Sequence, residues 1–165
     1  MTTDLFRPAL AGANSIVPAL LVVIALITAA VAAAIDWRTN RVPDALVGFT
    51  VVPVLLALVV VERSAHRLPE LLAGAALMAL PVLVVHMVAP AAMGFGDVKL
   101  AAALGTALGV TTPSLALPAL AAAAGLTLLV ACCTRRVAVP FAPGLVIGAG
   151  AVIALGSFEG WQVAR

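Results

Sequence analysis

Charged residues and tyrosine are what this sequence has least of. Of its 165 residues, 10% are charged and none is tyrosine, whereas 64% are hydrophobic. An ordinary soluble domain has about 45–50% apolar and about 25% charged residues. A monomeric globule of this length has too much surface for its volume to bury so many apolar side chains. The composition therefore excludes a disordered chain, almost any soluble enzyme and a nucleic-acid-binding protein with a basic face. It indicates a protein whose solvent is mainly lipid.

Cysteine is also scarce, and the net charge of +2 is too small to imply a polyanionic partner. The two cysteines are neighbours, Cys132 and Cys133. Adjacent cysteines cannot form a disulfide that links distant segments, and they lack the spacing of a zinc site. We expect both to be small apolar residues of a helix.

Long apolar stretches fill most of the chain. A helix needs about 20 apolar residues to cross a bilayer core of about 30 Å. The sequence contains about six stretches of this kind and therefore predicts an all-α, polytopic membrane protein with a single domain and no separate soluble domain. The predicted spans are residues 15–35, 45–61, 71–89, 97–110, 115–133 and 143–158. Lone prolines such as Pro53, Pro81 and Pro118 are not expected to end a span, because neighbouring helices can satisfy the freed carbonyl groups.

Basic residues between the spans predict the orientation of the chain. With six spans, both termini lie on the same side of the membrane. The loops on the opposite side hold five basic residues, Arg38, Arg41, Lys99, Arg135 and Arg136. The termini and the loops on their side hold four, Arg7, Arg63, Arg67 and Arg165. The positive-inside rule favours the first set as cytoplasmic.

Three ionisable residues lie close to the predicted spans. Asp36 closes the first span, Asp97 opens the fourth, and His86 lies late in the third. By span order, all three fall near the same membrane face. An ionisable residue at membrane depth costs about 2.5–3.5 kcal/mol on insertion scales, so each is a candidate for function. The two carboxylates could meet if the first and fourth helices pack together.

A pair of carboxylates has a specific chemical use. Two carboxylates within a few ångströms share a proton, because both cannot ionise cheaply. The ionised group can accept a proton from water while the protonated group polarises an amide carbonyl, which is the chemistry of an aspartic protease. The alternative is that Asp36 and Asp97 are only helix-end residues at the lipid–water interface.

The residues around Asp97 favour the catalytic interpretation. Gly94 and Gly96 permit unusual dihedral angles and close backbone approach just before a helix begins. Asp97 then lies in the first helical turn, where the helix dipole favours a negative charge. Lys99 points to another side of the helix, so we expect an interfacial anchor there. His86 is a lesser candidate for the site, and a hydrogen-bonded histidine inside the bundle is the commoner case.

The polar segment from Asp36 to Asp44 is predicted to be a short loop. Pro43 biases the residue before it toward an extended conformation. An extended segment beside Asp36 could form an edge for a bound peptide. The alternative is a plain cytoplasmic turn. Asp44 lies near enough to Asp36 in sequence to be a second, lesser candidate for the acid role.

Three motifs occur in order along the chain. The first is Asp36-x-Arg38 followed by Arg41-Val42-Pro43, the second is the GxGD-type stretch Gly94–Leu100, and the third is the proline-containing stretch Val139–Gly148. Together they resemble the type IV prepilin leader peptidases, which are polytopic aspartic proteases. The resemblance implies that Asp36 and Asp97 are the catalytic aspartates. It further implies supporting roles for Gly94, Gly96, Lys99, Arg38, Pro43, Pro140 and Pro143.

The resemblance also implies a substrate and a location. The family cuts prepilins and pilin-like precursors between a short basic leader and the following apolar helix. It needs no metal or organic cofactor and no nucleic acid. Its members are multi-pass proteins that lie in the lipid bilayer of the bacterial inner membrane. Their active site faces the cytoplasm. The resemblance does not indicate an oligomeric state.

This chain departs from the family pattern in two respects. Larger members carry an N-terminal domain with Cys-x-x-Cys zinc ligands, associated with N-methylation. The first cysteine here is Cys132, so we expect a short, peptidase-only form. The family often has Asn where this chain has Asp44.

Two other functions remain to be compared. A presenilin-like intramembrane protease also uses GxGD with a Pro-Ala-Leu motif, which occurs here at Pro118 but also at Pro18. A small membrane transporter or scaffold could use Asp36 and Asp97 as a proton relay, although a relay favours acids at mid-membrane.

Overall fold

The computed structural model of the chain describes residues 20, 22–36, 48–49, 51–52, 68–90, 93–111, 113–135 and 139–163, with α6 side chains described as far as Leu155. All regular secondary structure in these ranges is helical, which confirms the predicted all-α fold. The elements are the N-terminal helix Val22–Asp36, α3 Leu68–Val88, α4 Phe95–Thr111, the short 3₁₀ helix η3 Pro113–Leu115, α5 Ala116–Thr134 and α6 Ala142–Val163.

These elements follow the predicted spans closely. The spans predicted at 71–89, 97–110, 115–133 and 143–158 correspond to α3, α4, α5 and α6. The span predicted at 15–35 overlaps the N-terminal helix. The span predicted at 45–61 lies outside the described residues except for 48–49 and 51–52, which are helical. Pro81 and Pro118 lie inside α3 and α5 without ending them, as predicted.

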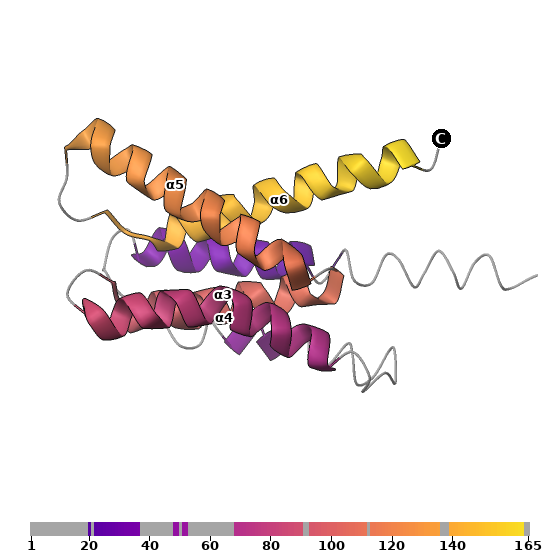
Figure 1. The fold of residues 1–165 in the computed structure, drawn as a ribbon, viewed down its shortest axis with the longest axis horizontal. Coiled ribbons are helices and arrows are strands. Elements are labelled where there is room, and N and C mark those ends of the chain that lie inside the picture. Colours follow the sequence, from indigo (N-terminus) through magenta and orange to yellow (C-terminus); the bar gives the residue numbers. More distant parts are fainter. Residues whose placement is uncertain are drawn as a thin grey trace, which may run out of the picture.

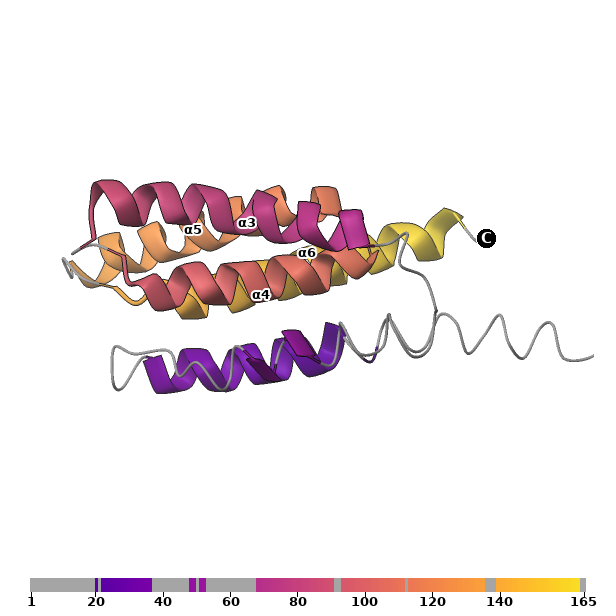
Figure 2. The same cartoon turned by 90° about the horizontal axis from the view of Figure 1, so that it is seen from below.

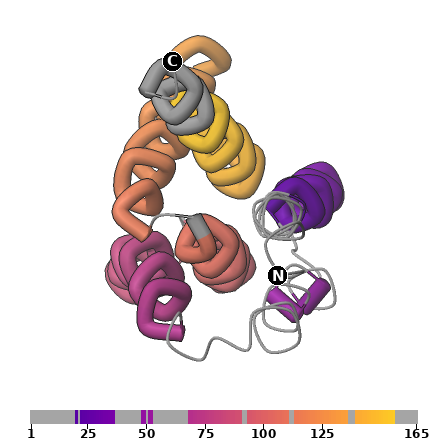
Figure 3. Tube along the Cα trace, turned by 90° about the vertical axis from the view of Figure 1, so that its right-hand side faces the viewer, coloured from indigo at the N-terminus to yellow at the C-terminus, as the bar shows by residue number. Residues whose placement is uncertain are grey.

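The helices run along one direction as a bundle (Figure 1). The N-terminal helix ends, and α4 and α6 begin, at the left end of Figure 1. Figure 2 shows α3 and α4 side by side, with the N-terminal helix next to α4. Along the bundle, α4 lies between α3 and the N-terminal helix (Figure 3). The start of α4 is therefore at the same end of the bundle as the end of the N-terminal helix.

The central position of α4 explains its burial. Most of its side chains from Asp97 onward are buried, and Leu100, Leu104 and Leu108 are among the most completely buried large side chains of the described residues. These leucines recur every four residues and form one face of the helix. Because α4 contacts other helices more than lipid, its first turn can contain the polar residue Asp97.

Glycines allow α3 and α4 to pack closely. A side-chain carbon on Gly105 would meet the carbonyl oxygen of Gly74, and the Cα of Ala75 at 2.9 Å. One on Gly109 would lie 2.7 Å from the carbonyl oxygen of Glu70. Small residues spaced four apart bring helix backbones together in lipid, where van der Waals packing replaces the hydrophobic effect.

Glycines also allow α5 and α6 to pack closely. A side-chain carbon on Gly148 would lie 2.5 Å from the carbonyl oxygen of Ala119 and 2.8 Å from the backbone nitrogen of Ala123. One on Gly144 would meet the hydroxyl of Thr127 and would lie 2.9 Å from the Ala123 carbonyl oxygen. The α5–α6 pair is thus built from two glycines on one helix against small residues on the other.

Large apolar side chains lie on the outside of the bundle. Leu72, Leu80 and Val84 of α3 are exposed, as are Leu128 and Leu129 of α5. In water such a surface would form large apolar patches, which soluble monomers rarely carry. A small-residue interior with large apolar residues outside is typical of helices surrounded by lipid. Cys132 and Cys133 are free and exposed on α5, as expected of small apolar helix residues.

Among the described residues, two helical segments are long and apolar enough to cross a membrane, Leu68–Val88 and Pro113–Thr134. The N-terminal helix and Ala142–Leu155 are apolar but shorter. α4 is also short, with 17 residues. The number of six spans therefore stays a prediction.

Candidate active site

Asp97 is held at the start of α4 by backbone hydrogen bonds. It lies in the first turn of the helix, as predicted. Its N–H donates to the carbonyl oxygen of Gly94 at 3.1 Å. In return, the Gly94 N–H donates to the Asp97 carboxyl group. A carboxylate at the third helical residue commonly satisfies the N-cap N–H in this way.

The Asp97 carboxyl group is buried, with 8% of the residue exposed. Its two oxygens differ in their surroundings. Oδ2 lies near Gly94, whereas Oδ1 is buried without a hydrogen-bond partner among the described residues. Buried polar atoms are normally hydrogen-bonded, so an exception requires an explanation and is often found at a functional site. Oδ1 is an acceptor that a water molecule or a bound peptide could use.

Asp36 approaches Asp97 from the N-terminal helix. Asp36 is the last residue of that helix and is also 8% exposed. Its charge acts on the Asp97 carboxyl group. Ala25 of the same helix belongs to one buried cluster with Ala107 and Val110 of α4. The N-terminal helix therefore packs against α4, with Asp36 and the first turn of α4 at the same end of the bundle.

His86 lies in the last turn of α3 and is hydrogen-bonded. Its Nδ1 is 2.8 Å from the carbonyl oxygen of Met93. Because a carbonyl oxygen only accepts, Nδ1 must carry the hydrogen. The bond ties the end of α3 to the residue just before Gly94.

Phe95 lies between His86 and Lys99. The ring centroids of His86 and Phe95 are 5.6 Å apart with an interplanar angle of 48°, which is a favourable aromatic arrangement. Lys99 Nζ lies 5.3 Å from the centroid of the Phe95 ring, within the range of a cation–π contact. Lys99 thus contacts Phe95 on its own helix, one turn back.

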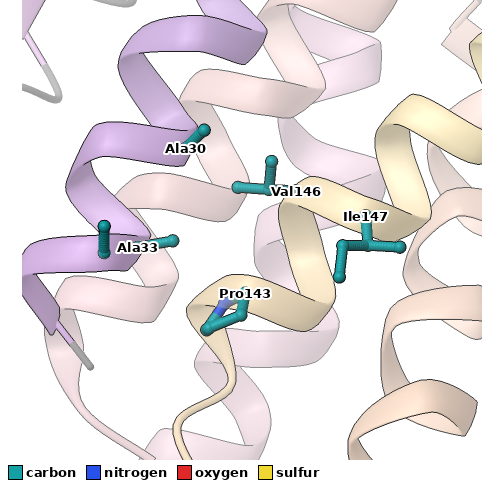
Figure 4. A pocket seen from close by; sticks show the side chains of 6 residues that line it. Ala30, Ala33, Pro143, Val146 and Ile147 are labelled. Atoms are coloured by element: carbon teal, nitrogen blue, oxygen red, sulfur yellow. The ribbon is translucent and has the colours of Figure 1, made fainter.

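Pro140 and Pro143 lie at the start of α6. Pro143 is in the first turn, where the missing N–H is not needed, and Pro140 is half-buried just before the helix. Pro143 borders an apolar pocket of about 330 Å³ between α6 and the N-terminal helix (Figure 4). Its other lining residues are Ala30, Ala33, Ala34, Val146 and Ile147. Ala33 is about one helical turn before Asp36, so the pocket lies near the end of the N-terminal helix.

The remaining candidates divide into two groups. Arg38, Pro43 and Asp44 lie outside the described residues. Gly94 and Gly96 are described, but no described glycine has a positive φ. The structure therefore shows no left-handed backbone at either glycine, and their supporting role stays a prediction.

No group of three or more His, Cys, Asp or Glu side chains in the described part of the chain could hold a metal ion. No metal position is assigned there.

The comparison with protein-family models gave one decisive result. The model of the type IV leader peptidase family matches residues 20–134, which is more than half of the chain. The chain belongs to this family. The family consists of membrane proteases, so membership implies a protease. Neither the curated proteins nor the solved structures gave a match.

The range matched to the leader peptidase family contains the Asp36 and Gly94–Leu100 motifs and His86. It ends before Pro140 and Pro143, so the family match does not include the third motif.

Sequence reasoning missed two features of this site. It did not predict the contact of Phe95 with His86 and Lys99, and nothing in the sequence pattern indicates it. It also missed the close glycine contacts that order the bundle. The four-residue spacings of Gly105 with Gly109 and of Gly144 with Gly148 were an available signal.

Proposed function

We propose that this leader peptidase is an aspartic endopeptidase that removes the leader peptide from prepilins or pilin-like precursors. Asp36 and Asp97 are its catalytic pair. One observation carries the proposal: two buried carboxyl groups from distant segments interact at one end of the bundle, and Asp97 Oδ1 is left without a partner. A purely structural carboxylate would be expected to have both oxygens satisfied.

The proposed reaction uses the pair as acid and base. The ionised carboxylate accepts a proton from water, which attacks the peptide carbonyl, while the protonated carboxyl group donates a hydrogen bond to the carbonyl oxygen. The proton is then passed to the departing amine as the C–N bond breaks. The shared proton belongs to the coupled pair rather than to one residue.

The position of the pair suits a substrate cut at a membrane surface. Asp36 ends one apolar helix and Asp97 begins another, so both lie at helix ends rather than at their middles. The bond cut in a prepilin lies between a basic leader and an apolar helix, which is where such a substrate leaves the lipid. We place the active site at the cytoplasmic face of the bacterial inner membrane, in a multi-pass protein.

The two alternative functions receive less support. A proton relay favours acids in the middle of facing helices, whereas this pair lies at one end of the bundle. The Pro-Ala-Leu sequence beginning at Pro118 lies in the first turns of α5. α5 follows the far end of α4, so this sequence is remote from Asp97.

The test is co-expression with a candidate pilin precursor, followed on a gel for loss of the leader. The unmodified enzyme is expected to shorten the precursor. Asp36→Asn and Asp97→Asn should each leave it at full length while the enzyme remains in the membrane.

Glu70→Gln is the matched control, because it also exchanges a carboxyl group for an amide. Glu70 is exposed in the first turn of α3, at the other end of that helix from His86. Glu70→Gln should cleave like the unmodified enzyme. Normal cleavage by either aspartate variant would remove that residue from the catalytic pair.

A further inference from the structure

The hydrogen bonds of His86 and Asp97 meet on a single peptide group. His86 Nδ1 bonds to the carbonyl oxygen of Met93. On the other side, Asp97 Oδ2 lies beside Gly94, whose N–H bonds to this carboxyl group and whose carbonyl oxygen accepts from the Asp97 N–H. The Met93 carbonyl and the Gly94 N–H belong to the same peptide bond.

The geometry of that peptide group couples the two hydrogen bonds. A trans peptide is planar, and its C=O and N–H point in opposite directions. Holding the carbonyl oxygen on one side therefore aims the N–H to the other side. His86 lies on one side of the Met93–Gly94 peptide, and Asp97 lies on the other. A hydrogen bond accepted by the carbonyl also polarises the N–H and strengthens the bond that it donates.

We propose that His86 is a positioning residue that orients the Met93–Gly94 peptide group, so that the Gly94 N–H holds the Asp97 carboxyl group in its working position. His86 touches neither the aspartate pair nor a reacting atom in this scheme. Its influence on cleavage rests on the proposed function of the pair, whereas the hydrogen-bond relay itself does not.

The aromatic contact explains how the imidazole is kept in place. Phe95 packs against the His86 ring from the first residue of α4. α3 and α4 are further locked by the contact of Gly74 with Gly105. The donor and the peptide that it orients are thus attached to two helices that cannot easily separate.

The first experiment determines which ring nitrogen of His86 carries the hydrogen, and it needs no substrate. The chain has two histidines, so His66→Gln leaves His86 as the single imidazole. Nitrogen-15 NMR of this variant, labelled in histidine, distinguishes which ring nitrogen carries the hydrogen in the neutral form. We expect the hydrogen on Nδ1. A neutral ring with the hydrogen on Nε2 would overturn the proposal.

The second experiment separates the donor from the ring. In His86→Asn the amide nitrogen occupies about the place of Nδ1, so the donor is kept and the ring is lost. In His86→Phe the ring contact with Phe95 is kept and the donor is lost. We expect His86→Phe to lower kcat by about ten- to a hundredfold with KM nearly unchanged, because a displaced catalytic group costs rate rather than binding. His86→Asn should stay within about threefold of the unmodified kcat.

The pH–rate profile tests whether the titration of His86 itself affects cleavage. Among the described residues, the titratable groups near Asp97 are Asp36, His86 and Lys99. Losing the Gly94 donor destabilises the ionised form of the pair, so the acidic limb should move to higher pH in His86→Phe. It should stay in place in His86→Asn. If the histidine's own titration set this limb, both variants would move it equally.

Two outcomes would overturn the positioning role. One is a His86→Phe enzyme with the unmodified kcat and pH profile, and the other is a His86→Asn enzyme as slow as His86→Phe. An unmodified enzyme that cleaves no precursor would instead count against the proposed function, and the NMR result would still test the relay.

Discussion

The carboxyl group of Asp36, at the end of the N-terminal helix, lies close enough to that of Asp97, at the start of α4, for the charge on one to act on the other. Both residues are buried. The proposed catalytic pair therefore predicts several consequences that can be measured.

The cleavage rate should depend on pH through this pair. Below the acidic limb both groups are protonated and no base is available, and above the alkaline limb both are ionised and no acid is available. Between the limbs the pair holds one proton, so we expect a bell-shaped profile with two apparent pKa values that belong to the pair. Initial cleavage rates measured from acidic to alkaline pH check this. Glu70→Gln should show the same two limbs, and a flat profile would contradict a shared proton.

The α5–α6 contact should not tolerate a side chain at Gly148. A Cβ there would lie 2.5 Å from the Ala119 carbonyl oxygen, so the two helices must move apart. We expect Gly148→Ala to lower the free energy of unfolding by about 1–3 kcal/mol, as overpacking does. Thermal unfolding in detergent measures the change.

Gly150 provides the control on the same helix, because nothing lies within 4 Å of a Cβ built there. Gly150→Ala should be neutral or should stabilise the protein by up to about 1 kcal/mol through helix propensity. Equal effects of the two substitutions would mean that α5 and α6 are not in close contact.

The first glycine of the GxGD motif should be dispensable for folding. A Cβ on Gly94 would meet only Asp97 Oδ2 at 3.8 Å and the Gly96 nitrogen at 3.9 Å, which are ordinary van der Waals distances. Alanine also keeps the N–H that bonds to Asp97. We expect Gly94→Ala to change the free energy of unfolding by less than about 0.5 kcal/mol, as substitutions without steric conflict do. A clearly lower unfolding temperature would show that the glycine is needed by the fold.

Arg135 ends α5 in a strained backbone conformation, with φ at 51° and ψ at 27°. Left-handed geometry costs residues with a Cβ about 1–2 kcal/mol, and glycine is free of this cost. We expect Arg135→Gly to be about 1 kcal/mol more stable than Arg135→Ala. Both variants lose the same charge, so their difference in chemical or thermal unfolding isolates the backbone. An alanine variant as stable as the glycine variant would argue against this helix end.

The helices and the candidate acids could be predicted because their signals are local. Asp36 and Asp97 interrupt apolar stretches, and in a chain with so little charge each interruption was conspicuous. The GxGD-type motif correctly located the first turn of α4. Gly94 and Gly96 have no positive φ, so the special role expected for these glycines stays a prediction.

The sequence by itself determined an all-α chain with long apolar segments, membership of a protease family and a pair of candidate aspartates. Composition and short motifs contain this information because they depend on neighbouring residues. Only the tertiary structure decided that α4 is central, that the charge of Asp36 acts on Asp97, and that His86 reaches the peptide before Gly94. These relationships depend on how closely the helices approach and on which faces meet. Glycine contacts such as that of Gly74 with Gly105 set those distances, and similar apolar spans do not distinguish one helix order from another.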